Sequence, residues 1–310
     1  MKNLSVIIPC YNEEPNIPEI YKRLSAACKE FGDDYELVFV NDGSEDNSWY
    51  AITRLAEGDN HIVAVDLSRN FGHEIALTAG LSTALGEKVL IIDADLQDPP
   101  ELLSPMMKMM NEGADVVYAV RKTRKGESFL KLFAARIFYR LLGTLTEVKI
   151  PFDTGDFRLM QRKVVEAFLA MPENPRFTRG MIAWTGFRQV SILYDRDERF
   201  AGKSKYNFRK LLHLALDAIS GFSVKPLRLT FYMGIILVFL GMAMLGYVIW
   251  SWNAGVAVPG WSSLAVLLIF LQSCQFIFLG IIGEYIGRVF TEVKKRPLFF
   301  IREVKRGNGK

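Results

Sequence analysis

The feature that most constrains this chain is a run of 55 residues, Leu229 to Gly283, that contains no Asp, Glu, Lys or Arg. Charged residues make up 23% of the whole chain, so they are concentrated in the rest of it. Because a transmembrane helix needs roughly 20 consecutive apolar residues, the run is long enough for two. The remainder has the composition of an ordinary globular domain. The sequence therefore predicts a globular domain joined to a membrane segment.

The uncharged run divides into two expected spans, Leu229–Trp252 with 24 residues and Ser263–Gly283 with 21. As helices they would be about 36 and 32 Å long, enough to cross a hydrocarbon core of about 30 Å. Residues 253–262 between them contain two glycines and a proline, which favours a short loop. The alternative, two buried helices of a soluble core, is disfavoured because such helices rarely lack charge on every face.

Basic charge flanks the uncharged run on both sides. Residues 1–202 carry 24 Lys and Arg against 30 Asp and Glu, whereas 203–228 carry 6 against 1 and 286–310 carry 8 against 2. The positive-inside rule places both flanks on the cytoplasmic face, which requires an even number of crossings. We therefore expect a multi-pass protein of the inner (plasma) membrane with its globular domain and both termini in the cytoplasm. The basic excess beside the membrane favours anionic lipid over nucleic acid as a partner.

Domain organisation follows from these boundaries. We expect a cytoplasmic domain over 1–205, an interfacial amphipathic helix and linker over 206–228, two transmembrane helices over 229–285, and a basic tail over 286–310. The amphipathic helix is predicted from apolar residues at steps of three and four: Phe208, Leu212, Ala215, Ile219 and Phe222. Packing of that helix on the domain core remains an alternative. The three cysteines, Cys10, Cys28 and Cys274, have no metal-ligand or disulfide spacing, which suits a reducing cytosol.

The first part of the chain alternates strand and helix patterns. Strands are expected over Leu4–Pro9, Tyr35–Asn41, Ile62–Leu67, Lys88–Ile92 and Ala114–Val120. Helices are expected between them, over Glu14–Glu30, Asp46–Glu57, His73–Leu85 and Pro100–Asn111. This alternation predicts an α/β fold, a doubly wound and mostly parallel sheet with helices on both faces. Ligands of such sheets bind outside the carboxyl ends of the strands.

Polar residues follow several of these strands, where a ligand would bind. Asp93 and Asp95 follow the fourth strand two positions apart, so their carboxylates are expected to point the same way. Ligation by oxygen alone favours Mg²⁺ or Mn²⁺ over zinc, and Mg²⁺ completes its coordination with waters and substrate phosphates. Neither a P-loop nor a dinucleotide glycine motif is present. We therefore expect a divalent metal ion, rather than a glycine loop, to hold a diphosphate substrate.

Three motifs occur together in this chain: Pro9-x-Tyr11-Asn12-Glu13, Asn41-Asp42-Gly43-Ser44 and Asp93-Ala94-Asp95-Leu96-Gln97-Asp98. With Gly155-Asp156-Phe157-Arg158 and the two C-terminal apolar segments, the chain resembles glycosyltransferase family 2, and within it the polyprenyl-phosphate glycosyltransferases, from end to end. The resemblance implies a GT-A type domain. It also implies inverting transfer of a hexose from a UDP-sugar, UDP-glucose, to undecaprenyl or another polyprenyl phosphate at the cytoplasmic face. One departure is Asn41, where family members often have Asp.

The same resemblance implies the site residues. Nucleotide binding falls to Pro9, Tyr11, Glu13, Asp42 and Asp93, and metal ligation to Asp95 and Gln97. Asp156 would be the catalytic residue facing the acceptor. Because a lipid phosphate is already anionic near neutral pH, we expect Asp156 to orient the acceptor more than to remove a proton. Binding of the acceptor phosphate is expected from Arg121, Arg136 and Arg140, and closure over the sugar donor from Ser204 and Lys205.

Two other functions stay open at this point. A processive polysaccharide synthase would carry a Gln-x-x-Arg-Trp motif and further spans, and the nearest stretch, Arg179–Trp184, does not match. A non-catalytic membrane-tethered module that binds nucleotide sugars would have no need of both Asp95 and Asp156. We also expect a homo-oligomer, because Gly234, Gly241 and Gly246 in the first span permit close helix packing.

Overall fold

The computed structural model of the chain describes residues 2–122, 154–174, 176–195, 225–255 and 260–307. Arg136, Arg140, Ser204 and Lys205 lie outside these described residues, as does the expected amphipathic helix up to residue 224. Their predicted roles therefore stay predictions.

All five expected strands are present, with ends that differ from the predicted ones by no more than two residues. They are β1 (Lys2–Cys10), β2 (Tyr35–Asn41), β3 (Ile62–Leu67), β4 (Gly86–Ile91) and β5 (Val116–Arg121). The helices between them are α1 (Ile17–Lys29), α2 (Ser48–Gly58), α3 (His73–Thr83) and α4 (Leu103–Asn111), the last preceded by the short 3₁₀ helix η1 (Pro100–Leu102). The expected α/β alternation is confirmed.

The sheet is larger than predicted, because it has eight strands in the order β7-β5-β6-β4-β1-β2-β3-β8. The additional strands are β6 (Thr154–Gln161), β7 (Gln189–Tyr194) and β8 (Ile301–Arg306), and the additional domain helices are α6 (Arg162–Ala170) and α7 (Thr178–Trp184). Strand β1 pairs in parallel with β2 and β4, as do β2 with β3 and β5 with β7. The antiparallel pairs are β4–β6, β5–β6 and β3–β8. The sheet is thus mostly parallel, as predicted.

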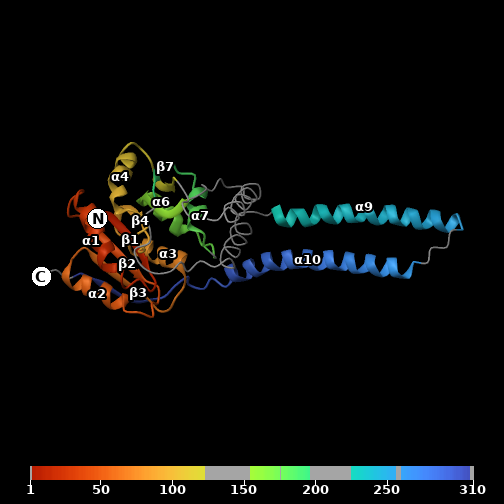
Figure 1. Ribbon diagram of the computed structural model, residues 1–310, viewed down its shortest axis with the longest axis horizontal. Coiled ribbons are helices and arrows are strands. Elements are labelled where there is room, and N and C mark those ends of the chain that lie inside the picture. The colour runs from red at the N-terminus through yellow and green to blue at the C-terminus, as the bar shows by residue number, and fades with distance from the viewer. Residues whose placement is uncertain (1, 123–153, 175, 196–224, 256–259, 308–310) are drawn as a thin grey trace.

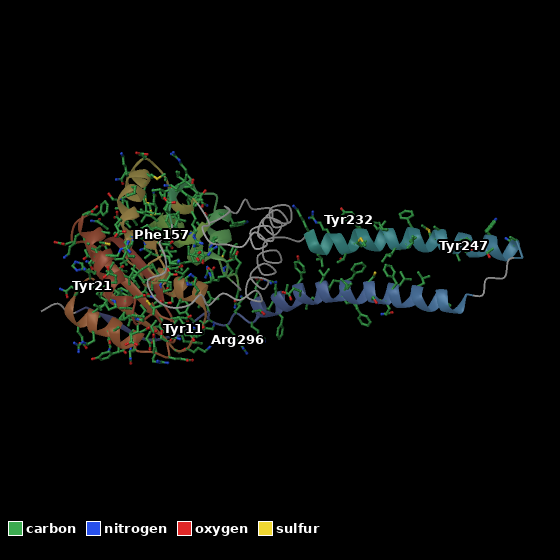
Figure 2. The ribbon with its side chains drawn as sticks, in the orientation of Figure 1. Tyr11, Tyr21, Phe157, Tyr232, Tyr247 and Arg296 are labelled. Carbon is green, nitrogen blue, oxygen red and sulfur yellow. The ribbon has the colours of Figure 1, made fainter. Side chains whose placement is uncertain are left out.

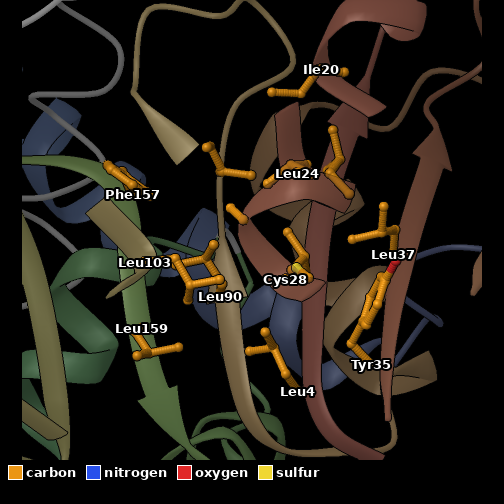
Figure 3. Close-up of a cluster of buried hydrophobic side chains, with 14 of the residues drawn as sticks. Leu4, Ile20, Leu24, Cys28, Tyr35, Leu37, Leu90, Leu103, Phe157 and Leu159 are labelled. Atoms are coloured by element: carbon orange, nitrogen blue, oxygen red, sulfur yellow. The ribbon is translucent and has the colours of Figure 1, made fainter. Parts of the chain in front are cut away.

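Helices cover both faces of the sheet, and each face has its own apolar core. One core packs strand residues such as Leu4 and Leu37 against α1, α2 and α4, and Figure 3 shows part of it around Leu24 and Cys28. The other packs the alternate strand residues, such as Ile7 and Val38, against α3, α6 and α7. This alternation follows from the two-residue period of a strand, which turns successive side chains to opposite faces. The parallel pairing of β1 with β2 and β4, and of β2 with β3, brings the carboxyl ends of these central strands to one edge of the sheet.

Beyond the domain, two long helices, α9 (Lys225–Asn253) and α10 (Trp261–Val293), run side by side and project away from the sheet (Figure 1). Figure 2 shows side chains of α9, Tyr232 and Tyr247 among them, standing clear of the domain. Within the described residues one segment, Thr230–Ser251, is long and apolar enough to cross a membrane. The first expected span is therefore supported by length and composition, whereas a second crossing by α10 stays a proposal.

The segment after α10 differs from the expected basic tail over 286–310. Helix α10 continues to Val293, and β8 then pairs antiparallel with β3, where Ile301 is opposite Leu67 and Arg306 is opposite Val63. This strand is not predictable from the sequence, because every residue of β8 is solvent-exposed and no alternation of apolar and polar residues marks it. Because β8 begins beside the end of β3, the base of α10 lies on the carboxyl side of the sheet.

Candidate active site

The loops that follow β1 and β2 are joined by hydrogen bonds at the carboxyl edge. The Asn12 backbone N–H donates to the Ser44 hydroxyl at 3.0 Å, and the Glu45 N–H donates to Asn12 Oδ1 at 2.8 Å. Asn12 has a φ of +53°, a left-handed conformation that Asn tolerates better than most residues. Two of the three predicted motifs therefore form one continuous structure.

Asp42 holds a third loop against this pair. Its Oδ1 accepts the Phe71 N–H at 2.7 Å and its Oδ2 accepts the Gly72 N–H at 3.0 Å. Burial raises the pKa of Asp42, and these two backbone donors act against that rise. The loop lies so close that a Cβ on Gly43, whose φ is +65°, would overlap the backbone of Asn70. Asp42 thus sets the start of α3.

The other predicted nucleotide residues lie at the same edge. Pro9 is buried near the end of β1, and Tyr11 is half-buried just beyond it. Glu13 accepts a hydrogen bond from the Asn16 amide at 2.6 Å, while its own N–H donates to the Ser48 hydroxyl at 2.9 Å. These contacts connect the first loop to the start of α2.

The loop after β4 carries the predicted metal ligands. The Gln97 N–H donates to Asp95 Oδ1 at 3.2 Å, which folds the loop back on itself. Leu96, between them, is buried and has a φ of +61°. A left-handed conformation costs a non-glycine residue roughly 1–2 kcal/mol, and such strain concentrates at functional sites. The turn at Leu96 is therefore an independent sign that this loop serves a site.

Asp156 lies in β6, buried with 3% exposure, and is surrounded by cations. Arg179 of α7 binds it with two parallel hydrogen bonds, Nε to Oδ1 at 2.8 Å and Nη2 to Oδ2 at 2.9 Å. His73 Nε2, at the start of α3, lies 3.3 Å from Asp156 Oδ2 and 3.6 Å from Asp93 Oδ1. Arg158 Nη2 is 3.9 Å from Asp156 Oδ1. Elements β4, α3, β6 and α7 thus converge on one charged cluster.

The charges of this cluster determine its protonation. Burial opposes ionisation of Asp156, but Arg179 and His73 outweigh it and hold the pKa of Asp156 well below its usual range. Burial likewise disfavours the charged form of His73, yet Asp93 and Asp156 raise the pKa of His73 to about 10. Near neutral pH the cluster therefore contains an imidazolium and a carboxylate with little affinity for a proton.

Asp93 faces His73 at 3.6 Å but has less hydrogen bonding than Asp156. Its Oδ1 is buried and has no hydrogen-bond partner within the described residues. Burial raises its pKa to about 6, His73 acts against this rise, and the nearby carboxylates of Asp98, Asp156 and Asp95 add to it. No group of three His, Cys, Asp or Glu side chains with metal-site geometry occurs in the described residues. A cation held by one or two carboxylates and substrate phosphates still fits this surplus of negative charge.

Arg121 lies at the end of β5, beside the same edge. Its Nε donates to the Tyr194 hydroxyl at 3.5 Å, and that hydroxyl donates a short hydrogen bond to Asp98. Asp98 follows the predicted metal loop directly, and both Asp98 and Tyr194 are buried. The contact links β5 and β7 to the loop after β4.

Sequence reasoning brought Asp93, Asp95 and Asp156 to one site but missed His73, Arg158 and Arg179. His73 was placed only as the first residue of a helix, and Arg179 was noted only as part of a motif that did not match. Arg158 stands two residues after Asp156 in a strand that was not predicted. The sequence signal that could have pointed to this cluster is the Gly155-Asp156-Phe157-Arg158 motif, in which two charged residues alternate with an apolar one as on one face of a strand.

Comparison with known proteins identifies the family. A model described as glycosyl transferase family 2 matches residues 5–169. This chain belongs to glycosyltransferase family 2. A second model, described as a GtrB C-terminal hairpin, matches residues 225–289, which cover α9 and most of α10. The family match over residues 5–169 covers His73, Asp93, Asp156 and Arg158 of the charged cluster, whereas Arg179 follows it.

Relatives match this glycosyltransferase over nearly its whole length. An uncharacterized glycosyltransferase of Synechocystis is 47% identical, covering 97% of this chain and 95% of its own. A prophage bactoprenol glucosyl transferase homolog of Escherichia coli and the bactoprenol glucosyl transferase of Shigella phage SfII are each 40% identical, covering 98% of this chain and 99% of their own.

Solved structures share the fold. Glucosyl-3-phosphoglycerate synthase of Mycobacterium tuberculosis, in complex with Mn²⁺, UDP and phosphoglyceric acid, superposes with a TM-score of 0.50 and 18% identity, over 71% of this chain and 76% of that one. A further mycobacterial protein gives a TM-score of 0.50 at 19% identity, over 71% and 73%. At this identity the likeness establishes the α/β fold of the domain.

Proposed function

We propose that this family 2 glycosyltransferase transfers glucose from UDP-glucose to a polyprenyl phosphate at the cytoplasmic face of the membrane. The observation that carries the proposal is one chain that joins the charged cluster at the carboxyl edge to two long apolar helices. Because Ile301 pairs with Leu67 at the end of β3, those helices leave the domain on the side of the cluster. Relatives named bactoprenol glucosyl transferases, 40% identical over the same length, support both substrates.

The donor nucleotide is assigned to the joined loops after β1 and β2. Tyr11 offers an aromatic face, and Glu13 and Asp42 offer carboxylates at strand ends that can accept from ribose or base. Asp42 also holds the loop at 69–72 through two backbone hydrogen bonds, so it shapes the pocket as well as lining it. Donor binding therefore depends on the geometry of three loops.

Mg²⁺ or Mn²⁺ is assigned to the strained loop after β4, with Asp95 and Gln97 as ligands and Asp93 beside them. When bound, the ion would neutralise negative charge on the departing nucleoside diphosphate, a contribution of several kcal/mol. Within the described residues, Asp93 Oδ1 is buried, accepts no hydrogen bond and has only His73 Nε2, at 3.6 Å, as a cationic neighbour, which supports a cation at this position.

Asp156 is assigned to the acceptor side as an orienting group. A carboxylate held by Arg179 and His73, with its pKa lowered, is a poor base. The acceptor needs little help, because a phosphate monoester with a second pKa of about 6 is largely dianionic at neutral pH. The acceptor phosphate oxygen therefore attacks the anomeric carbon of the glucose directly, and the bond from that carbon to UDP breaks as UDP leaves. Arg121 supplies positive charge beside the acceptor phosphate, and the Asp156 cluster orients that phosphate.

A multi-pass arrangement accompanies this function. The domain precedes α9 and β8 follows α10, yet β8 is hydrogen-bonded within the domain's own sheet. Both ends of the helix pair therefore lie on the same side, and a pair that crosses the membrane crosses it twice. The basic residues at both flanks favour the cytoplasm for that side.

The decisive experiment is transfer of radiolabelled sugar from a panel of UDP- and GDP-sugars into extractable lipid. It uses the full-length protein with undecaprenyl phosphate and Mg²⁺ or Mn²⁺. We expect label from UDP-glucose, lost with EDTA and reduced by a factor of about 1000 in Asp95→Ala. The matched control is Asp115→Ala, which removes an acidic side chain remote from the site, ion-paired to Lys163.

Three outcomes would overturn the proposal. Turnover that survives EDTA would exclude the assigned metal, and labelled polymer would indicate a processive synthase. Tight UDP-glucose binding without transfer to any polyprenyl phosphate would instead favour a membrane-tethered binding module. An unfolding temperature for Asp95→Ala close to that of wild type shows that lost activity is not lost structure.

A further inference from the structure

The strand that follows the apolar helices contacts the donor loops through a chain of buried polar groups. Arg302 of β8 donates to Asp66 Oδ2 at 2.9 Å, and the Asn41 amide donates to Asp66 Oδ1 at 2.7 Å. Asn41 Oδ1 in turn accepts the Ser44 N–H at 3.2 Å. Ser44 then accepts the Asn12 N–H through its hydroxyl. The chain of contacts crosses three strands and ends in the two loops assigned to the nucleotide.

A β-bulge in β8 places Arg302 for its contact with Asp66. The register of β3 and β8 shifts between Asp66, opposite Glu303, and Leu67, opposite Ile301, so Arg302 is the additional residue of a β-bulge. Bulges re-aim a side chain and occur frequently beside active sites. The same guanidinium also donates to the Ser68 carbonyl at 2.7 Å, which fixes its direction.

The burial of Asp66 and Asn41 makes their hydrogen bonds important for the position of the loop. Asp66 is 1% exposed and Asn41 is 3% exposed, and the Arg302 side chain that pairs with Asp66 is 61% exposed, so Arg302 lies between these buried groups and solvent. An ionised carboxylate in such a position needs a cation and hydrogen bonds. Arg302 supplies both from a strand that lies outside the amino-terminal part of the chain.

We infer that Arg302 is a positioning residue for the nucleotide-sugar site, acting through Asp66 and Asn41 on the loop at 41–48. This inference rests on the proposed function for the identity of the ligand. It gives the strand after the helix pair a role in donor affinity, although that strand contacts no substrate. It also accounts for Asn41 in place of Asp, since an ionised carboxylate there could not donate to Asp66.

The same strand offers a matched control. Arg306 is four residues further along β8 and reaches another buried carboxylate, Glu36 Oε2, at 3.5 Å. Glu36 accepts from Ser5 and from the Leu85 N–H, both at 2.6 Å, at the opposite end of the sheet. Arg306→Gln therefore removes the same kind of ion pair from the same strand without touching the donor loops.

The first test compares Arg302→Gln with Arg306→Gln in the full chain in detergent. We expect UDP to bind Arg302→Gln about ten-fold more weakly than wild type, with KM for the donor raised equally and kcat at saturating donor within about two-fold. Arg306→Gln should bind UDP as wild type does. Equal effects of the two substitutions, or a loss confined to kcat, would overturn the inference, because either result indicates general destabilisation.

The second test needs no ligand. Hydrogen exchange of the backbone amides at 41–48 should be about ten-fold faster in Arg302→Gln and unchanged in Arg306→Gln. Unchanged exchange in Arg302→Gln would refute the link. If wild-type protein fails to bind any nucleotide, the proposed function fails, yet this comparison still decides whether Arg302 orders the loop.

A rescue variant separates positioning from loss of stability. Asn41→Asp alone places a carboxylate against Asp66 and should weaken UDP binding about ten-fold. Adding Asp66→Asn restores a donor between the two positions and leaves an amide oxygen for Arg302. The double variant should recover UDP binding to within about three-fold of wild type, and failure to recover would contradict the proposed chain of contacts.

Discussion

The two halves of the site are held together by different groups. The donor half is the set of loops that follow β1 and β2, where Asp42 accepts from the backbone N–H groups of Phe71 and Gly72. These donors carry no charge, and a side-chain substitution leaves them in place. On the acceptor half, Asp156 is held by the side chains of Arg179 and His73. The donor half should therefore depend mainly on backbone geometry, whereas the acceptor half should depend on the charges of its side chains. The predictions below test that difference.

The largest effect is expected for Asp156→Asn. An amide can accept from Arg179 at one position but leaves Arg179, His73 and the buried Arg158 without their shared counter-charge. We expect kcat for glucosyl transfer to fall by a factor of about 100–1000, with donor KM nearly unchanged.

Steady-state kinetics with undecaprenyl phosphate would measure this loss. Asp115→Asn, which changes a carboxylate paired with Lys163 away from the site, serves as the control. Activity of Asp156→Asn above half of wild type would show that the charge of the cluster is dispensable.

A smaller effect, on the donor half, is expected for Asp42. Asp42→Ala leaves two partly buried N–H groups without an acceptor, which should lower the free energy of unfolding by about 2 kcal/mol and raise donor KM about 30-fold. Asp42→Asn keeps one acceptor oxygen, so about half of each effect is expected. Thermal unfolding and donor titration would measure both. If Asn proved as damaging as Ala, charge rather than backbone geometry would govern this half too.

The smallest effect is a pH dependence that separates the halves. The pKa of His73 is raised to about 10, above the value of about 6.5 for a free imidazole, so its protonation stabilises the folded state. That stabilisation is complete below pH 6.5 and is lost as the pH rises through about 10.

The measurement is the difference in unfolding temperature between wild type and His73→Gln, which should shrink from pH 6 to pH 10. The deficit of Asp42→Ala should change less over the same range, because the N–H groups of Phe71 and Gly72 do not titrate and, among the described residues, Asp42 has no titrating cation as its hydrogen-bond donor. A constant difference for His73→Gln would mean that the histidine is neutral in the folded protein.

The central sheet was predictable because its strands are buried on both faces. Strands β1 to β4 are largely apolar runs separated by helix-length segments, and that pattern can be recognised in one sequence without an alignment. Strand β6 was missed because Asp156 and Arg158 interrupt its apolar character, and Asp156 is buried with Arg158, Arg179 and His73 around it. Burial of this kind depends on partners far away in the chain.

The site was predictable where its residues are neighbours in sequence. Asp93, Asp95 and Gln97 stand in one short motif, so spacing alone brought them together. His73, Asp156 and Arg179 are separated by 83 and 23 residues and meet only through sheet topology. The contact between Arg302 and Asp66 joins residues 236 positions apart, and no local pattern in β8 predicts it.

The pairing of β8 with β3 also sets the order in which the protein can be completed. Because β8 follows α10 in the chain, the ribosome makes both apolar helices before the eighth strand exists. Until then β3 is an exposed edge strand, the kind of surface on which proteins aggregate. The sheet can therefore gain its eighth strand only after the helix pair has been made. A domain in which β8 covers β3 is one whose apolar helices have already been synthesised.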